Sequence, residues 1–251
     1  MEKRLQELMP EIKIFFFEEL DSTNSKAAEL ARTGEDGVFI VAARRQSSGR
    51  GRMGRSFYSG EGGLYMSLVL RPHSSESATL LTTAAAVAAA EAIEALSGEK
   101  AEIKWVNDIF LRGRKVCGIL AEGSFSPGAT SPDFAVVGIG VNVTEPESGF
   151  PDDIREIAGA VLSRGGANHI AELAADIVRR FLPLCGDLES RGWYENYLRR
   201  LNCLDRPVTV RQGEITRSAA AVALDRDFRL LVRFDEGGEQ WLSFGEISIR
   251  Q

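Results

Sequence analysis

The sequence predicts an α+β fold, in which a mixed, mainly antiparallel sheet packs with helices and a small β-barrel follows at the C-terminus. Three observations predict it. Short apolar runs typical of strands alternate with helical stretches up to Val143. An alanine-rich run of helical length lies among them. From Pro207 onward every apolar run has the pattern of a strand, so we expect one domain over residues 1–204 and a second over residues 205–251.

The first elements are predicted from apolar runs and capping residues. Ile12–Phe17 is rich in isoleucine and phenylalanine and indicates a strand. Ser22–Asn24 are capping residues, and apolar residues follow at helical spacing, so we expect a helix that ends near Thr33. Gly37–Ala43 and Leu64–Leu70 indicate two further strands, with a polar loop between them.

The middle of the chain predicts a buried helix and a run of strands. Threonines and glutamates interrupt Ala78–Leu96, and alanine is only weakly hydrophobic, so we interpret this run as a core helix and not a membrane span. Arg112-Gly113-Arg114 indicates a hairpin turn, and Gly138 and Gly140 mark a place where another backbone or a ligand approaches closely. Strands are expected at Glu102–Trp105, Ile109–Leu111, Val116–Glu122 and Phe134–Val143.

The remaining elements are a helical segment and an all-strand tail. Pro151–Leu162 is expected to be loop and short helix. Asn168 is expected to cap a helix that Pro183 kinks or ends, and helix resumes over Trp193–Leu201. The tail is too short for a secure core of its own, so we expect it to lean on the main domain. Its strands are expected at Val208–Val210, Ile215–Val222, Phe228–Phe234 and Gln240–Ile249.

Composition excludes several classes of protein. The chain has 251 residues, of which 44% are hydrophobic and 26% charged, as in ordinary globular proteins. A net charge of −6 argues against general nucleic-acid binding. Three widely spaced cysteines predict neither a disulfide framework nor a zinc site, and His73 and His169 lie far apart. Because no apolar signal segment begins the sequence, we expect a cytoplasmic protein without a membrane partner.

A basic loop interrupts this acidic background. Five arginines lie between Arg44 and Arg55, with glycines at 49, 51 and 54. Glycine lets backbone N–H groups approach an anion, and arginine offers forked donors that match phosphate. The loop therefore predicts closure over a polyphosphate or an acyl phosphate. Two alternatives stay open at this point: a flexible basic surface loop, and an arginine–glycine segment that binds RNA.

Four stretches together carry a family resemblance. They are Asp21–Asn24, Gln46 with Gly49–Arg55, Lys104–Asp108 with Lys115, and Gly138–Asn142. In this order and spacing they resemble the biotin protein ligases (biotin–[acetyl-CoA carboxylase] ligases), whose hallmarks are S-T-N, G-R-G-R-x-G-R, K-W-P-N-D followed by a lysine, and G-x-G-x-N. The resemblance spans nearly the whole chain. It implies a class II synthetase-like catalytic domain and an SH3-like C-terminal barrel.

The resemblance also implies a reaction in two steps. Biotin's carboxylate attacks the α-phosphate of ATP, giving biotinyl-AMP and pyrophosphate. A lysine of a biotin carboxyl carrier protein, a subunit of acetyl-CoA carboxylase or a similar carboxylase, then attacks the mixed anhydride. Fixed cations and Mg²⁺ offset the repulsion between the two anions in the first step. Members of the family include monomers and dimers, so a homodimer is one expected assembly.

Site residues follow from the motif positions. Lys115 and Arg50 are implied as catalytic residues, and Asp108 as a candidate for metal binding. Biotin contacts are implied for Ser22, Thr23, Asn24, Gln46, Arg50, Gly51, Arg52, Lys115 and Gly118. ATP or adenylate contacts are implied for Arg52, Arg55, Phe57, Lys104, Asn107 and Asn142. Hydroxyl groups both donate and accept hydrogen bonds, which suits biotin's ureido ring, and a lysine on a flexible stem can follow an anion from reactant to intermediate.

The chain departs from the family pattern at two positions. Val106 stands where the family has proline, and Phe57 stands where well-known bacterial members carry a tryptophan against adenine. Phenylalanine can still stack, with less surface. Only 21 residues precede Ser22, too few for the winged helix-turn-helix of bifunctional members, so we expect neither operator DNA binding nor repressor activity.

Other functions stay in competition. A lipoate or octanoate ligase or transferase resembles this family in fold and also uses a lysine. A nucleic-acid-binding module that uses the basic loop is a rival without enzymatic activity. For Lys115 by itself, the alternative is a solvated hairpin beside Arg112-Gly113-Arg114.

Overall fold

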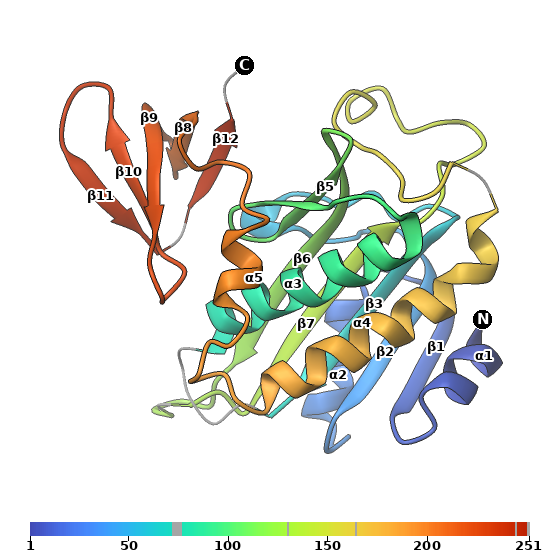
Figure 1. The fold of residues 1–251 in the computed structure, drawn as a ribbon. Helices are drawn as coiled ribbons and strands as arrows, with labels where there is room; N and C mark the ends of the chain where they lie inside the picture. Colours follow the sequence, from blue (N-terminus) through green and yellow to red (C-terminus); the bar gives the residue numbers. More distant parts are fainter. Residues whose placement is uncertain (72–76, 130, 164, 244, 250–251) are drawn as a thin grey trace.

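Two β-sheets with helices packed on the larger one make up the computed structural model (Figure 1), which describes residues 1–71, 77–129, 131–163, 165–243 and 245–249. The larger sheet has seven strands in the order β1-β2-β3-β7-β6-β5-β4. The smaller has five, in the order β11-β10-β9-β8-β12. His73 lies outside the described residues.

The larger sheet is mixed and mainly antiparallel, as the sequence predicts. Among its described strands, β1 and β2 run parallel and every other neighbouring pair is antiparallel. Its strands are β1 (Lys13–Leu20), β2 (Phe39–Gln46), β3 (Gly63–Leu70), β4 (Glu102–Lys104), β5 (Asp108–Leu111), β6 (Arg114–Ser124) and β7 (Phe134–Asn142). The order sets β7 between β3 and β6, so strands that are distant in the chain become neighbours at the centre.

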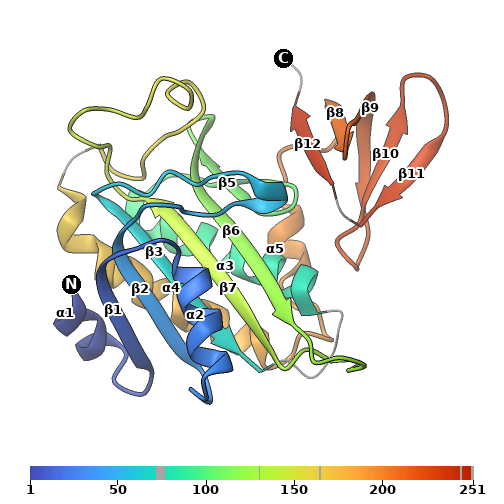
Figure 2. The ribbon, with the colours of Figure 1, turned by 180° about the vertical axis from the view of Figure 1, so that it is seen from behind.

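Helices cover both faces of this sheet. α2 packs on one face, where Ala27 joins a small apolar cluster with Phe39 and Val136 (Figure 2). α3 and α4 cover the other face and bury the main core (Figure 1). The helices are α1 (Glu2–Leu8), α2 (Thr23–Arg32), α3 (Ser77–Ser97), α4 (Ile170–Cys185) and α5 (Tyr194–Leu198), with short 3₁₀ turns η1 (Arg52–Gly54) and η2 (Gly166–His169).

The apolar helix α3 is a core element. By length and composition Thr79–Ser97 could cross a membrane, but most of that segment is buried inside the protein. Its inner alanines, Ala84–Ala86 and Ala88–Ala90, have no exposed surface. The apolar composition of α3 is therefore explained by its position between the sheet and α4, as expected for a core helix.

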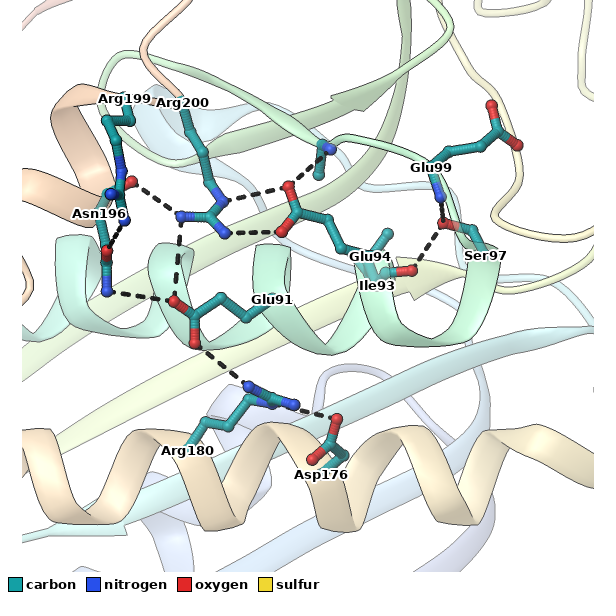
Figure 3. A network of polar contacts seen from close by, with 11 residues as sticks. Glu91, Ile93, Glu94, Ser97, Glu99, Asp176, Arg180, Asn196, Arg199 and Arg200 are labelled. Atoms are coloured by element: carbon teal, nitrogen blue, oxygen red, sulfur yellow. Dashed lines mark hydrogen bonds and ion pairs between the residues drawn. The ribbon is translucent and has the colours of Figure 1, made fainter.

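Charged side chains fasten α3 to its neighbours (Figure 3). Arg200 beyond α5 donates to both carboxylate oxygens of Glu94, at 2.6 and 3.2 Å. Arg180 of α4 contacts Glu91 at 3.3 Å. Burial acts to raise the pKa of Glu94, but the Arg200 guanidinium and the Ala101 N–H outweigh it and hold that pKa below its usual value.

The smaller sheet corrects one prediction about the tail. Its strands are β8 (Pro207–Gln212), β9 (Ile215–Leu224), β10 (Leu230–Phe234), β11 (Glu239–Leu242) and β12 (Glu246–Ile249). The predicted single strand Gln240–Ile249 is therefore wrong. β11 pairs with β10 and β12 with β8, at opposite edges of the sheet, and Gly245 has a positive φ of 123° between them.

The region before α5 differs from its prediction too. Within Pro151–Leu162, all of which the structure describes, the chain makes turns and forms no helix. The backbone N–H of Lys115 on β6 donates to the Ile157 carbonyl, and the Lys115 carbonyl accepts from the Gly159 N–H, each at 2.8 Å. These bonds to the sheet take the place of hydrogen bonds within a helix. The N-cap of α4 is His169 and not Asn168, and α5 is shorter than predicted.

An aromatic junction joins the tail to the main domain, as expected. The Phe228 ring stacks on Trp193 at 5.6 Å and meets Tyr197 edge-on at 5.3 Å. Trp105 donates its indole N–H to the Phe228 carbonyl at 2.9 Å, and Tyr197 donates its hydroxyl to the Val106 carbonyl at 3.1 Å. The Trp105–Val106 peptide bond is cis. The junction thus holds the segment that leads directly into Asn107 and Asp108.

The Glu94 ion pair makes stability depend on pH. A carboxyl whose pKa is lowered by folding adds stability above its unfolded pKa, and that stability is lost as pH falls through the folded pKa. We expect Glu94→Gln to lower the free energy of unfolding by about 1–3 kcal/mol at neutral pH. The difference should shrink as pH falls below the usual value of 4.5. Urea unfolding across this pH range tests it, with exposed Glu7→Gln as the control; a difference independent of pH would contradict it.

Candidate functional site

A pocket at the centre of the larger sheet gathers the predicted site residues. We call it the central pocket. The structure brings together every predicted site residue except Asn142. The pocket's lining includes Ser22, Thr23, Asn24, Gln46, Arg50, Gly51, Arg52, Arg55, Phe57, Lys104, Asn107, Asp108, Lys115 and Gly118, together with Gly138 and Gly140. The N-terminus of α2, the loop after β2 and the β6–β7 pair supply most of these residues.

One end of the pocket is neutral and polar; we call Ser22, Thr23, Asn24 and Gln46 the polar end. Ser22 caps α2, as its sequence position predicts. Gln46 accepts from the Thr23 backbone N–H at 2.7 Å and from the Thr23 hydroxyl at 3.1 Å. The Gln46 amide in turn donates to Ser59 at 2.8 Å. The same residues thus cap the helix and present donors and acceptors to the pocket.

Two residues behind the polar end were missed by the sequence analysis. Ser67 is fully buried; its hydroxyl donates to Asn24 Oδ1 at 2.6 Å and lies 2.8 Å from Thr23 Oγ1. Glu122 accepts from Asn24 Nδ2 at 2.8 Å. Ser67 is a polar residue inside an otherwise apolar strand run and Glu122 is the charged residue that ends another, and these exceptions to the pattern were the available signal.

Glycines form the floor of the pocket. Gly118 and Gly140 face each other across β6 and β7, and the Phe57 ring lies on them. A Cβ at Gly140 would come within 2.5 Å of that ring. At Gly138 a Cβ would lie 2.1 Å from Asn24 Oδ1. The close approach predicted at Gly138 and Gly140 is therefore made here by the side chains of Asn24 and Phe57.

The other end is charged; we call Lys104, Lys115 and Arg52 the cationic end. Asp108 sits between the lysines, 2.7 Å from Lys115 Nζ and 3.6 Å from Lys104 Nζ, and its side chain is 14% exposed. Arg52 donates to Asn107 at 3.3 Å. Lys115 lines the pocket and makes an ion pair with Asp108, so it is not a residue of a solvated hairpin.

The fit of a metal ion at Asp108 is poor. Both of its carboxylate oxygens are paired with lysines. Within the part of the chain that the structure describes, no group of three His, Cys, Asp or Glu side chains could hold a metal ion. Asp108 therefore serves as a counter-ion to the two lysines.

The two ends are spaced along β6. Asp108 pairs with Gly118, while Asn24 reaches the Leu120 carbonyl and Glu122. Leu120 and Glu122 lie two and four residues beyond Gly118 on β6, which corresponds to roughly 7–13 Å along the strand. The pocket can therefore hold a small molecule with a neutral polar head and an anionic tail, and its fixed cations can stabilise charge that develops at the tail.

The arginine–glycine loop, Gly49–Arg55, closes over one side of the pocket. Gly51 donates to the Arg55 carbonyl at 2.7 Å and Phe57 to the Gly49 carbonyl at 2.8 Å, so the loop folds back on itself. Met53 at its tip has a φ of 55° and is 56% exposed. Arg50 pairs with Glu122, on the strand that also carries Lys115.

Asn142 is not among the pocket residues. Its amide donates to the Gly159 carbonyl at 3.1 Å, and its own carbonyl accepts from Val161. It holds the segment after β7 against the sheet. The cysteines also lie outside the pocket lining. Burial raises the pKa of the Cys185 and Cys203 thiols to about 12, and it raises the pKa of the Cys117 thiol as well.

Known proteins resemble this chain over much of its length. Residues 16–142 match the model described as "Biotin/lipoate A/B protein ligase family". The bifunctional ligase/repressor BirA of Salmonella typhimurium is 30% identical over 240 residues, which is 92% of this chain and 72% of that protein. The biotin–[acetyl-CoA-carboxylase] ligase of Paracoccus denitrificans is 43% identical over 145 residues, 56% of this chain and 55% of that protein. The chain spans about half the length of the Paracoccus protein and of the BirA proteins from Bacillus.

Solved structures show the same fold. The biotin protein ligase from Aquifex aeolicus in complex with biotin and ATP has a TM-score of 0.77 and 25% identity, covering 95% of this chain and 99% of that one. A mutant of the same Aquifex ligase in complex with biotin has a TM-score of 0.79 and 26% identity, covering 95% and 98%.

The close contact at Gly138 leads to a prediction. Gly138→Ala must push Asn24 away from Ser67 and Glu122, because the new Cβ would overlap Asn24 Oδ1. We expect the free energy of unfolding to fall by about 1–3 kcal/mol in urea titrations. Gly192→Ala is the control, since its nearest neighbour would lie at an ordinary 3.5 Å. Equal stability of the two variants would show that the Asn24 contacts contribute little.

Proposed function

Because the chain belongs to the biotin/lipoate A/B protein ligase family, we propose that it activates biotin with ATP to biotinyl-AMP and transfers biotin to a lysine of a carboxyl carrier protein. One observation carries the proposal: a neutral hydrogen-bonding end and a cationic end lie in one pocket, at a spacing set by β6. Biotin has a ureido ring at one end and a carboxylate at the other, so its two ends match the pocket's.

The polar end suits the ureido ring. Such a ring has one carbonyl acceptor and two N–H donors. Ser22 and Thr23 hydroxyls both donate and accept, and the Gln46 amide does the same through two atoms. Because Gln46 is already held by Thr23 and Ser59, these groups are oriented before the ligand arrives.

The cationic end suits the adenylation step. A biotin carboxylate oxygen bonds to the α-phosphorus of ATP, and the bond from that phosphorus to the bridging oxygen of pyrophosphate breaks. Lys115 would lie beside both anions once a carboxylate competes with Asp108 for it. Lys104 and Arg52 add fixed positive charge on the same side. Mg²⁺ would enter bound to the phosphates of ATP, since Asp108 does not fit as its ligand.

The second step uses the same mixed anhydride. An amine from the carrier lysine attacks the acyl carbon, an amide forms, and AMP leaves. The arginine–glycine loop would keep water from the anhydride until then. We further propose that Arg55 and Phe57 contact the adenylate, and that Asn142 acts there only through the segment it supports.

A specific observation favours biotin over lipoate. A plain acyl chain would displace water from the polar end without offering Thr23, Gln46 and Asn24 any hydrogen bond beyond those they already make to protein groups, which costs affinity. Nucleic-acid binding is less well supported, because the net charge is −6 and Arg50 is already paired with Glu122. The carboxylase partner, the cytoplasmic location, a homodimer, and the absence of operator binding and repressor activity stay predictions.

The proposal predicts biotin-dependent exchange of labelled pyrophosphate into ATP. With Mg²⁺ present, we expect exchange with biotin and none above background with lipoate or octanoate. Exchange with lipoate and not with biotin would indicate a lipoate ligase instead of a biotin ligase. Absence of exchange with every acid, in folded protein, would refute the adenylation step.

Lys115→Ala should lower the exchange rate by about 10²–10³-fold, because a fixed cation beside the developing charge is removed. Its unfolding midpoint should stay close to that of the wild type. Lys13→Ala is a matched control, since Lys13 makes an ion pair of the same 2.7 Å length with Glu35, away from the pocket. If Lys115→Ala turned over at the wild-type rate, Lys115 would have no role in catalysis.

A further inference from the structure

A continuous chain of polar contacts runs behind the central pocket. Asn24 contacts both Glu122 and the buried Ser67. Ser67 also contacts Thr23, and the Thr23 hydroxyl donates to Gln46. From Gln46 the chain continues to Ser59, which donates to the Phe57 carbonyl at 3.0 Å. At its other end Glu122 binds Arg50. The contacts therefore tie Arg50, near the start of the arginine–glycine loop, to Phe57 just beyond its end.

Glu122 holds two partners of different kinds. One carboxylate oxygen accepts from Asn24, which is 5% exposed, and the other accepts from Arg50. Because Asn24 fixes the carboxylate, only the arginine loses freedom when the ion pair forms. An ordinary pair at this exposure, 43% and 40% for the two side chains, must order both partners.

The Arg50–Glu122 pair also forms part of a wall. Asn24 and Arg50 line the central pocket on one side and an outer groove, with Glu122 and Phe134, on the other. The two arginines just before the loop make pairs outside the pocket, Arg44 with Glu18 and Arg45 with Glu61. Among these ion pairs, only that of Arg50 connects to the polar end.

We propose that Glu122 is a positioning residue that fastens the arginine–glycine loop, through Arg50, to the hydrogen-bonded groups of the polar end. Ligand at the polar end then steadies Asn24, Glu122 and Arg50 together, so an occupied pocket keeps its loop closed. The inference deepens the proposed function and rests on it for the second of its two readouts; the first needs no activity.

The first readout is cleavage of the loop by trypsin in the protein without ligand. Glu122→Gln keeps an acceptor for Asn24 and removes the charge that holds Arg50. We expect cleavage after Arg52 and Arg55 to become about three- to fivefold faster at low salt. At high salt the wild type should approach the variant, because the pair is half exposed. Glu61→Gln, which removes an exposed partner of Arg45, should cleave as the wild type does.

The second readout is release and hydrolysis of enzyme-held biotinyl-AMP in the absence of a carrier. Glu122→Gln should lose the intermediate about three- to fivefold faster than the wild type. Arg50→Gln should show the same loss, and the double variant should lose it no faster than Arg50→Gln alone, because the two residues act through one contact. Matching unfolding midpoints separate this effect from general destabilisation.

The outcomes separate the two proposals. If the wild type forms no adenylate, the proposed function fails, and the trypsin comparison still tests the fastening of the loop. If adenylate forms but Glu122→Gln matches the wild type in both cleavage and leakage, Glu122 does not position the loop. Additive effects in the double variant, or a salt-independent difference, would equally overturn the inference. Should Glu122→Gln not fold, Arg50→Gln removes the same pair from the loop side.

Discussion

The buried hydroxyl of Ser67 is the contact on which the pocket depends. A polar group without any exposed surface must find partners inside the protein, and Ser67 finds them on α2. This places Asn24 against Gly138 of β7. The helix is thereby oriented by polar contacts on the pocket side and by the apolar cluster of Ala27 and Phe39 beneath it.

Carboxylates balance the cations of an acidic protein around this pocket. Asp108 shares its charge between Lys104 and Lys115, and Glu122 holds Arg50. An arriving anion competes with these carboxylates for cations that the protein already holds, so these positive groups are in place before any reaction begins. The aromatic junction at Phe228 supports the same arrangement from outside, because it anchors the segment before Asn107.

Much of the secondary structure could be predicted because it depends on local physics. Apolar strand runs, the Ser22 cap and the Arg112-Gly113 turn depend on a few neighbouring residues, and the structure contains them all. Predictions failed where a distant partner decided the outcome. The backbone of Lys115 pairs with that of Ala158, so this region joins the sheet. The two halves of the predicted last strand pair with different strands, the first half with β10 and the second with β8.

The sequence by itself determined which chemical groups are present and the order in which they occur: hydroxyls at the start of α2, arginines between glycines, and lysines on both sides of Asp108. Only the tertiary structure decided which of them meet. Strand order sets β6 against β7 and so brings Glu122 to Asn24 and Arg50, which lie 98 and 72 residues away from it in the sequence. It also turns Asn142 toward Gly159. Such contacts depend on long-range pairing, which no local pattern in the chain encodes.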